Sequence, residues 1–221
     1  LPLYFVALAP ASPTEILGWR IVLSLIFCVL LLAVAKQVHS AFALLRSPRT
    51  ALLTALAGVL ILINWVIFVI ATQTGHVVDA ALGYFINPLV TAFLGVVILR
   101  EKLRPAQWVA LGVGATAVVV LMVGYGQFPW IALGLAFSFG FYGFVKKSLG
   151  QMPALTGLAL ETLWVTPIAV VMLWWVAGES GLEIAVNGVW LLVLLGSAGV
   201  VTSVPLLLFA AATRRLPLTS V

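Results

Sequence analysis

Charged residues divide the chain into long uncharged tracts. Positions 50–78, 105–145 and 184–213 hold 29, 41 and 30 residues without a single charge. An apolar run of about 18 residues or more is typical of a membrane-spanning helix, and 41 residues leave room for two such helices. The pattern predicts an all-α integral membrane protein with several spans.

Prolines and capping residues predict where these helices begin. Ser12, Pro13 and Glu15 form a helix start, with Ser12 as N-cap, Pro13 at the first helical position and Glu15 closing a capping box. This capping role fully accounts for the presence of Glu15. These start and stop signals predict seven complete spans, at about 13–36, 49–72, 77–99, 105–123, 129–146, 153–176 and 188–212. A helix fragment before Pro10 and the beginning of another after Pro217 complete the pattern.

The composition agrees with a membrane protein. Hydrophobic residues make up 64% of the chain and charged residues 8%, with a mean hydropathy of +1.25. Because soluble domains carry about 25% charged residues, an ordinary water-soluble domain is excluded. The net charge of +5 and the pI of about 9.8 raise the question of nucleic-acid binding, which the positions of the basic residues answer.

Ten of the eleven basic residues fall at alternate ends of the predicted spans. They are Lys36, Arg46, Arg49, Arg100, Lys102, Arg104, Lys146, Lys147, Arg214 and Arg215. The connections at the opposite ends carry none, as the positive-inside rule describes for cytoplasmic loops. The charge therefore indicates topology and contact with anionic lipid, and no nucleic-acid partner is expected.

The helix pattern superposes on itself when the chain is shifted by 140 or 141 residues. Because the shift spans five helices, the two halves must point in opposite directions across the membrane. We therefore expect a five-plus-five inverted repeat of ten helices, with residues 1–123 in the first half and 124–221 in the second. Both ends of the chain lie in apolar segments, so we expect most of helix 1 and nearly all of helices 9 and 10 to be missing.

Several familiar chemistries find no support in the sequence. The single cysteine, Cys28, and the distant His39 and His76 give neither a disulfide framework nor a metal motif, so no metal or cofactor is expected. The stretch 112–117 has the spacing of a dinucleotide fingerprint, but it lies within a predicted membrane helix, where small residues serve close packing. Neither a zinc-protease motif nor a serine–lysine pair is present.

Two charged residues fall inside predicted spans. Arg20 lies about six residues into its helix, and Glu161 lies about eight residues from an end of its own. A charge at mid-membrane costs at least about 2.5–3.5 kcal/mol on insertion scales, so both are expected to avoid lipid and to line a polar cavity or form an ion pair. The 141-residue shift places Arg20 on Glu161. Arg20 could instead snorkel to the headgroups, and whether the two residues touch stays open.

Uncharged polar residues favour a lined pathway. Gly83, Asn87, Thr91 and Gly95 recur every four residues on one helix, with Tyr84 beside them and Pro88 in the middle. Helix packing alone explains such small residues about as well. The further candidates in other spans are Asn64, Trp65, Pro167 and Pro205.

The residues now carry a resemblance to a known family. The run 81–89, ALGYFINPL, continued by LREKL at 99–103, resembles the RarD branch of the EamA-type drug/metabolite transporters. Asn64-Trp65, the run FGFYG at 139–143 with Lys146-Lys147, and Leu160-Glu161 with Pro167 are similar to the same branch. The resemblance covers essentially the whole chain. It implies a ten-helix permease of the bacterial inner membrane, in a branch named for chloramphenicol sensitivity.

The sequence therefore predicts a secondary transporter for small organic molecules that acts by alternating access. Because no ATP motif exists, any energy must come from a gradient or from the substrate itself. The candidate cavity residues are Arg20, Asn64, Trp65, Tyr84, Asn87, Tyr142 and Glu161, and the candidate hinges are Pro88, Pro167 and Pro205. Glu161 is expected to be the residue most tightly tied to transport. The alternatives are an intramembrane enzyme acting on lipid and a receptor or scaffold that transports nothing; the oligomeric state stays open.

Overall fold

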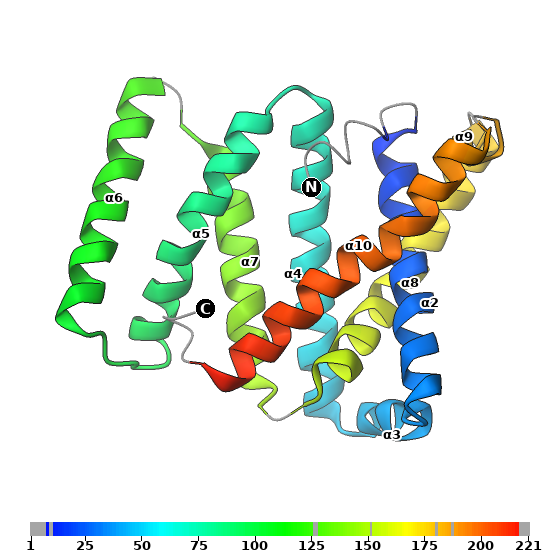
Figure 1. Cartoon of the computed structure of the whole chain (residues 1–221), viewed down its shortest axis with the longest axis horizontal. Coiled ribbons are helices and arrows are strands. Elements are labelled where there is room, and N and C mark those ends of the chain that lie inside the picture. The colour runs from blue at the N-terminus through cyan, green and yellow to red at the C-terminus, as the bar shows by residue number, and fades with distance from the viewer. Residues whose placement is uncertain are drawn as a thin grey trace.

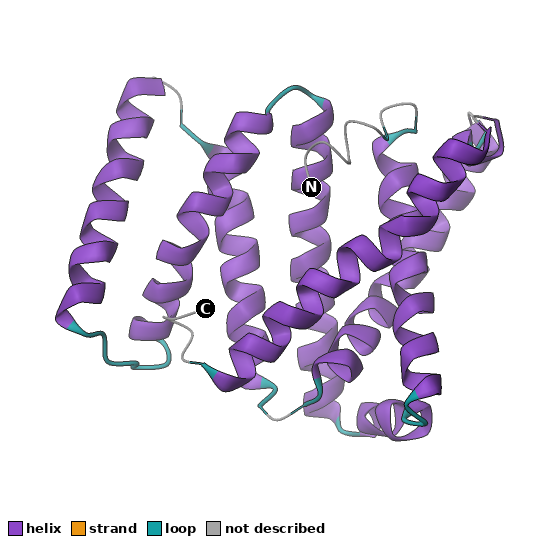
Figure 2. Cartoon of the chain, in the orientation of Figure 1, coloured by secondary structure: helices purple, strands orange, loops and turns teal. Residues whose placement is uncertain are grey.

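The computed structural model describes residue 8 and residues 11–125, 128–150, 152–179, 181–186 and 188–216. Every regular element within these residues is a helix (Figure 2). The elements are α2 (Pro13–Val34), α3 (Val38–Ala43), the 3₁₀ helix η1 (Leu44–Arg46), α4 (Pro48–Gln73), α5 (Val77–Val97), α6 (Pro105–Tyr125), α7 (Trp130–Ser148), α8 (Ala154–Glu179), α9 (Glu183–Val186) and α10 (Gly188–Arg215). The helix fragments predicted before Pro10 and after Pro217 lie outside the described residues.

Local sequence sets the ends of the long helices. Ser12 Oγ accepts a hydrogen bond from the backbone N–H of Glu15 at 3.2 Å, and Pro13 occupies the first position of α2. Pro48 and Pro105 likewise open α4 and α6, where the missing N–H of proline costs no helical hydrogen bond. Each predicted span coincides with one long helix. The segment between α2 and α4 had no predicted helix, yet it forms α3 and η1.

Five helices within the described ranges are long and apolar enough to cross a membrane: α2, α4, α5, α8 and the part of α10 from Val189 to Thr213. Helix α6 supplies a shorter apolar segment, Pro105–Leu121, and α7 ends in two lysines. The all-α membrane class is thus confirmed. Of the seven predicted complete spans, five are thus long and apolar enough to cross a membrane within the described residues, and α6 and α7 are the other two.

The long helices stand side by side, as Figure 1 shows, with α6 at one edge and α2 and α8 at the other. Helix α2 packs along α8 and α10, α5 packs along α7, and α4 lies against both α7 and α8. Helix α10 crosses the others obliquely (Figure 1). The largest buried core therefore draws its side chains from α2, α3, α4, α7, α8 and α10.

Two glycines let backbones meet at helix crossings. A Cβ on Gly58 of α4 would lie 2.6 Å from the carbonyl oxygen of Glu161 on α8. A Cβ on Gly199 of α10 would lie 2.5 Å from the carbonyl oxygen of Leu23 on α2. Since real Cβ atoms do not approach oxygens so closely, both crossings require glycine.

Most of the basic residues lie at one end of the bundle, and three exposed tryptophans lie at or near the other end. Ten basic residues lie in four places: from the end of α2 to the first turn of α4, in the loop after α5, in the last turn of α7 and at the end of α10. These places are at the lower end in Figure 1. Trp130, Trp174 and Trp190 lie at or near the other helix ends with exposed side chains. Aromatic belts at a membrane surface have this arrangement.

Candidate functional site

A cavity of about 140 Å³ lies among five of the long helices. Its lining comprises Arg20 of α2, Asn64, Trp65 and Phe68 of α4, Tyr84 of α5, Phe139 of α7, and Val201, Thr202, Pro205, Leu206 and Phe209 of α10. The structure therefore brings four predicted cavity residues, Arg20, Asn64, Trp65 and Tyr84, and the predicted hinge Pro205 to one place. It does so from helices far apart in the sequence.

Arg20 is held in place from two sides. Its guanidinium carbon lies 4.4 Å from the centroid of the Trp65 ring, and its Nε donates a hydrogen bond to Thr202 Oγ1 at 2.7 Å. Only 7% of the residue is exposed, so it does not snorkel to the headgroups. A cation over an indole face is attracted by the ring quadrupole, more strongly where water is excluded. The Trp65 ring thus stabilises a buried positive charge at the cavity wall.

Asn64 and Tyr84 shape the cavity by their contacts with neighbouring helices. Asn64 Nδ2 donates to the carbonyl oxygen of Leu135 and to Ser138 Oγ, both at 3.0 Å, so this amide group ties α4 to α7. The Tyr84 ring meets Phe68 edge to face at a centroid distance of 5.8 Å. Both residues line the cavity, but the amide nitrogen of Asn64 is already engaged in packing.

Aromatic rings form another part of the wall. The ring centroids of Phe139 and Phe209 lie 4.7 Å apart. The Tyr142 ring stacks on Phe209 with a centroid distance of 6.1 Å. These contacts join α7 to α10, and both phenylalanines line the cavity. The wall is suited to an apolar or aromatic body.

Glu161 and Tyr142 belong to a separate, fully buried polar cluster. Lys146 Nζ donates to Glu161 Oε1 at 2.7 Å, and the Tyr142 hydroxyl donates to Glu161 Oε2 at 3.0 Å. Glu161 and Tyr142 are completely buried and Lys146 is 6% exposed. Gly157 makes room for the pair, because a Cβ there would lie 3.1 Å from Lys146 Nζ. Neither predicted residue lines the cavity.

Arg20 and Glu161, which the 141-residue shift places at equivalent positions, each have other partners. Glu161 bonds to Lys146 and Tyr142, while Arg20 contacts Thr202 and Trp65. Lys146 differs from the expected position at the membrane surface, because it turns its ammonium group into the protein toward Glu161.

Asn87, Pro88 and Pro167 lie away from the cavity lining. Asn87 accepts hydrogen bonds from the Thr91 hydroxyl, at its carbonyl oxygen (2.8 Å) and at Oδ1 (3.3 Å). Pro88 and Pro167 sit inside α5 and α8, and both are exposed. The polar stripe of α5 is therefore engaged within its own helix at Asn87 and Thr91.

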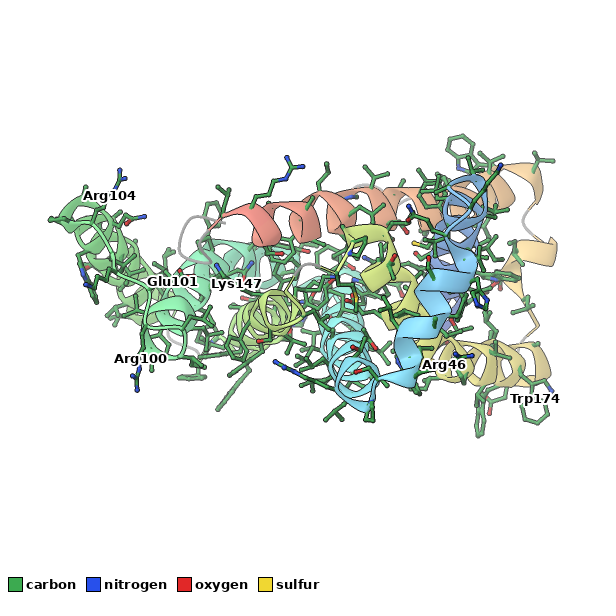
Figure 3. All side chains as sticks on the ribbon, turned by 90° about the horizontal axis from the view of Figure 1, so that it is seen from below. Arg46, Arg100, Glu101, Arg104, Lys147 and Trp174 are labelled. Atoms are coloured by element: carbon green, nitrogen blue, oxygen red, sulfur yellow. The ribbon has the colours of Figure 1, made fainter. Side chains whose placement is uncertain are left out.

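Two further contacts near the helix ends also join distant segments. The Glu15 carboxylate accepts hydrogen bonds from the backbone N–H groups of Glu183 (3.0 Å) and Ile184 (3.1 Å). Besides its predicted place in a capping box, Glu15 therefore binds the start of α9. At the basic end, Lys147 Nζ contacts Glu101 Oε1 at 2.9 Å and the carbonyl oxygen of Leu216 at 3.0 Å (Figure 3). The first contact joins α2 to α9, and the second joins α7 to the loop after α5 and to the residue that follows α10.

Sequence reasoning missed Thr202, Lys146 and the aromatic residues Phe139 and Phe209 as parts of these sites. Thr202 and Ser203 form a polar pair within an apolar helix, a signal that the sequence does contain. Phe139 and Lys146 stand in the stretch that carries the family resemblance, which assigned them no role, and Phe209 gave no signal because phenylalanines are abundant throughout the chain.

A bundle of membrane helices around a central cavity, with a buried cation and aromatic walls, defines the class of polytopic membrane proteins with an internal small-molecule site. The family model of the EamA-like transporter family matches residues 3–123. The chain belongs to the EamA-like transporter family and is a multi-pass transporter of the bacterial inner membrane.

The curated relatives agree with this assignment. The chain is 43% identical to Protein RarD of Streptomyces exfoliatus, over 100% of the chain and 70% of the relative. It is 40% identical to the uncharacterized transporter YojE of Bacillus subtilis, over 98% and 73%. It is 28% identical to the Chloramphenicol-sensitive protein RarD of Pseudomonas aeruginosa, over 99% and 73%. No solved structure matches the chain.

Proposed function

We propose that the cavity beside Arg20 and Trp65 is the substrate site of a secondary transporter that moves small organic molecules by alternating access. The observation that carries the proposal is the cavity itself, a space of about 140 Å³ with a buried cation in its wall. Its lining comes from α2, α4 and α5 on one side of residue 123 and from α7 and α10 on the other. A site between two halves is where a rocking motion changes access.

An inverted repeat supports this mechanism. We propose that residues 1–123 and 124–221 are the two halves, so that α2 corresponds to α8 and α4 to α10. Gly58 and Gly199 are 141 residues apart, and they mark the α4–α8 and α10–α2 crossings. Exchanging the halves converts one crossing into the other, as a two-fold axis in the membrane plane requires.

The prolines supply bending points in this proposal. Pro88, Pro167 and Pro205 each interrupt a membrane helix, and a proline removes one backbone hydrogen bond and bends the helix. Pro205 carries most weight because it lines the cavity, so a change of bend there alters the space beside Thr202 directly.

Accessibility from both membrane faces tests the mechanism. With Cys28 replaced by serine, a single cysteine at Val201 in the cavity wall is treated with an impermeant maleimide in vesicles of each orientation. We expect labelling from both sides, whereas a cysteine at Ser47 reacts from one side only. Labelling of Val201→Cys from one side under all conditions would refute alternating access. Ligand binding without flux in proteoliposomes would make the protein a receptor.

A further inference from the structure

We propose that the cavity takes a small organic anion, with a carboxylate seated on Arg20 and an apolar body about the size of one aromatic ring. The inference rests on the proposed function, because it names the substrate class of the same site. Three properties of the cavity lead to it: the sign of its charge, the chemistry of its wall and its volume.

The charge favours an anion. Among the described residues that line the cavity, Arg20 is the one with a formal charge, and it is 7% exposed. A guanidinium group offers a planar fork of N–H donors that matches a carboxylate. Where water is largely excluded, attraction to an opposite charge and repulsion of a like charge are both stronger than in water. A carboxylate is therefore favoured over a neutral group, and a cation is excluded.

The wall favours an apolar body behind that carboxylate. The guanidinium carbon of Arg20 lies over the Trp65 ring, and Phe139 of α7 contacts Phe209 of α10. Tyr84 and Phe68 meet on another side. Burial of an aromatic or aliphatic group against these rings removes apolar surface from water. A strongly hydrated inorganic anion would gain nothing from such a wall.

The volume limits the size of that body. The cavity measures about 140 Å³. An apolar cavity of about 150 Å³ holds one benzene molecule, whereas pockets for drug-sized ligands measure about 300–1,000 Å³. A metabolite with a single ring or a short branched chain fits this space, and a molecule as large as chloramphenicol exceeds it.

Three probes of nearly equal shape separate the effect of the ligand's charge on binding from the effect of its shape. Benzoate, benzamide and benzylamine are titrated by calorimetry into the protein in uncharged detergent at neutral pH. We expect benzoate to bind about tenfold or more tightly than benzamide, because hydrogen bonds to a charged partner are the stronger ones, and we expect benzylamine not to bind. Equal binding of benzamide, or tighter binding of benzylamine, would overturn the inference.

Substitutions at the cation connect the preference to Arg20. Arg20→Gln should make benzoate and benzamide bind equally, and Arg20→Lys should keep a weaker preference because an ammonium lacks the fork. The matched control is Arg46→Gln, which removes an exposed arginine in η1 at the basic end (Figure 3) and should change neither affinity. If Arg20→Gln does not fold, the Arg20→Lys protein and the three probes on the unchanged chain still test whether the cavity prefers an anion.

Flux and lipid competition separate this inference from the proposed function. Anion-selective binding without benzoate flux in proteoliposomes would leave the site chemistry in place and refute the transporter. Flux of benzamide equal to that of benzoate would support a transporter and overturn the anion preference. Displacement of benzoate by phosphatidylglycerol would show a site for lipid headgroups and would also overturn the inference.

Discussion

The buried ion pair between Lys146 and Glu161 gives the sharpest test of the packing. Glu161→Gln leaves an acceptor for the Tyr142 hydroxyl but removes the carboxylate, so the ammonium group of Lys146, 6% exposed, is left as an uncompensated buried charge. Breaking a buried pair by removing one partner typically costs about 3–5 kcal/mol. We expect the free energy of unfolding to fall by about that amount, and Lys146→Met to have a similar effect.

The double change isolates the interaction between the two side chains. Lys146→Met combined with Glu161→Gln removes both charges, and a buried pair replaced by neutral groups of similar volume is often close to neutral. The double variant should therefore recover most of the lost stability, with a coupling energy of about 3 kcal/mol or more. Glu179→Gln on the same helix is the matched control, because Glu179 is exposed at the end of α8.

Unfolding in mixed micelles, followed by circular dichroism, measures these changes. Losses below about 1 kcal/mol in both single variants would place the pair at a solvated surface and refute the reasoning. Simple addition of the two losses in the double variant would refute a direct interaction. Flux measured at several pH values on the stable double variant then examines the predicted coupling role of Glu161. Unchanged pH dependence would assign the carboxylate to architecture alone.

Three further predictions concern packing, bending and topology. Gly199→Ala should lower the free energy of unfolding by about 1–3 kcal/mol in the same micelle assay, because its Cβ would overlap a carbonyl oxygen of α2, whereas Gly196→Ala, with open space around its Cβ, should not. Pro88→Ala should insert normally and slow transport in proteoliposomes by restoring a helical hydrogen bond; normal flux at normal abundance would reduce Pro88 to a packing residue. In a cysteine-free background, a cysteine at Ser47 should label from the cytoplasm and one at Glu183 from outside, and the reverse result would contradict the orientation.

The helix ends were predictable because their determinants are local. The Ser12 cap, Pro13 and Pro48 act within one turn of the residues that they affect, so the sequence alone locates α2 and α4 closely. The uncharged tracts fix the membrane class in the same way. The short helices α3 and η1 escaped prediction because they lack the long apolar run that identifies a span.

The partners of the polar residues were less predictable, because they depend on how distant helices pack. The insertion cost indicated that Arg20 and Glu161 avoid lipid, and both are buried. Their actual partners, Thr202 and Lys146, lie 182 and 15 residues away in the chain. No local rule selects either of them.

Lys146 and Lys147 show how helix geometry separates neighbours that the sequence treats alike. Successive residues on an α-helix point about 100° apart, so two adjacent lysines at the end of α7 cannot both face the same surroundings. Lys146 turns inward to Glu161, and Lys147 turns to Glu101 at the rim. Because Glu161 is bound to Lys146 and Tyr142, the carboxylate deep within α8 is held by partners other than Arg20. The positive charge at the cavity wall and the neutralised pair behind it are therefore two separate electrostatic units, and a substitution in one need not alter the ligand preference of the other.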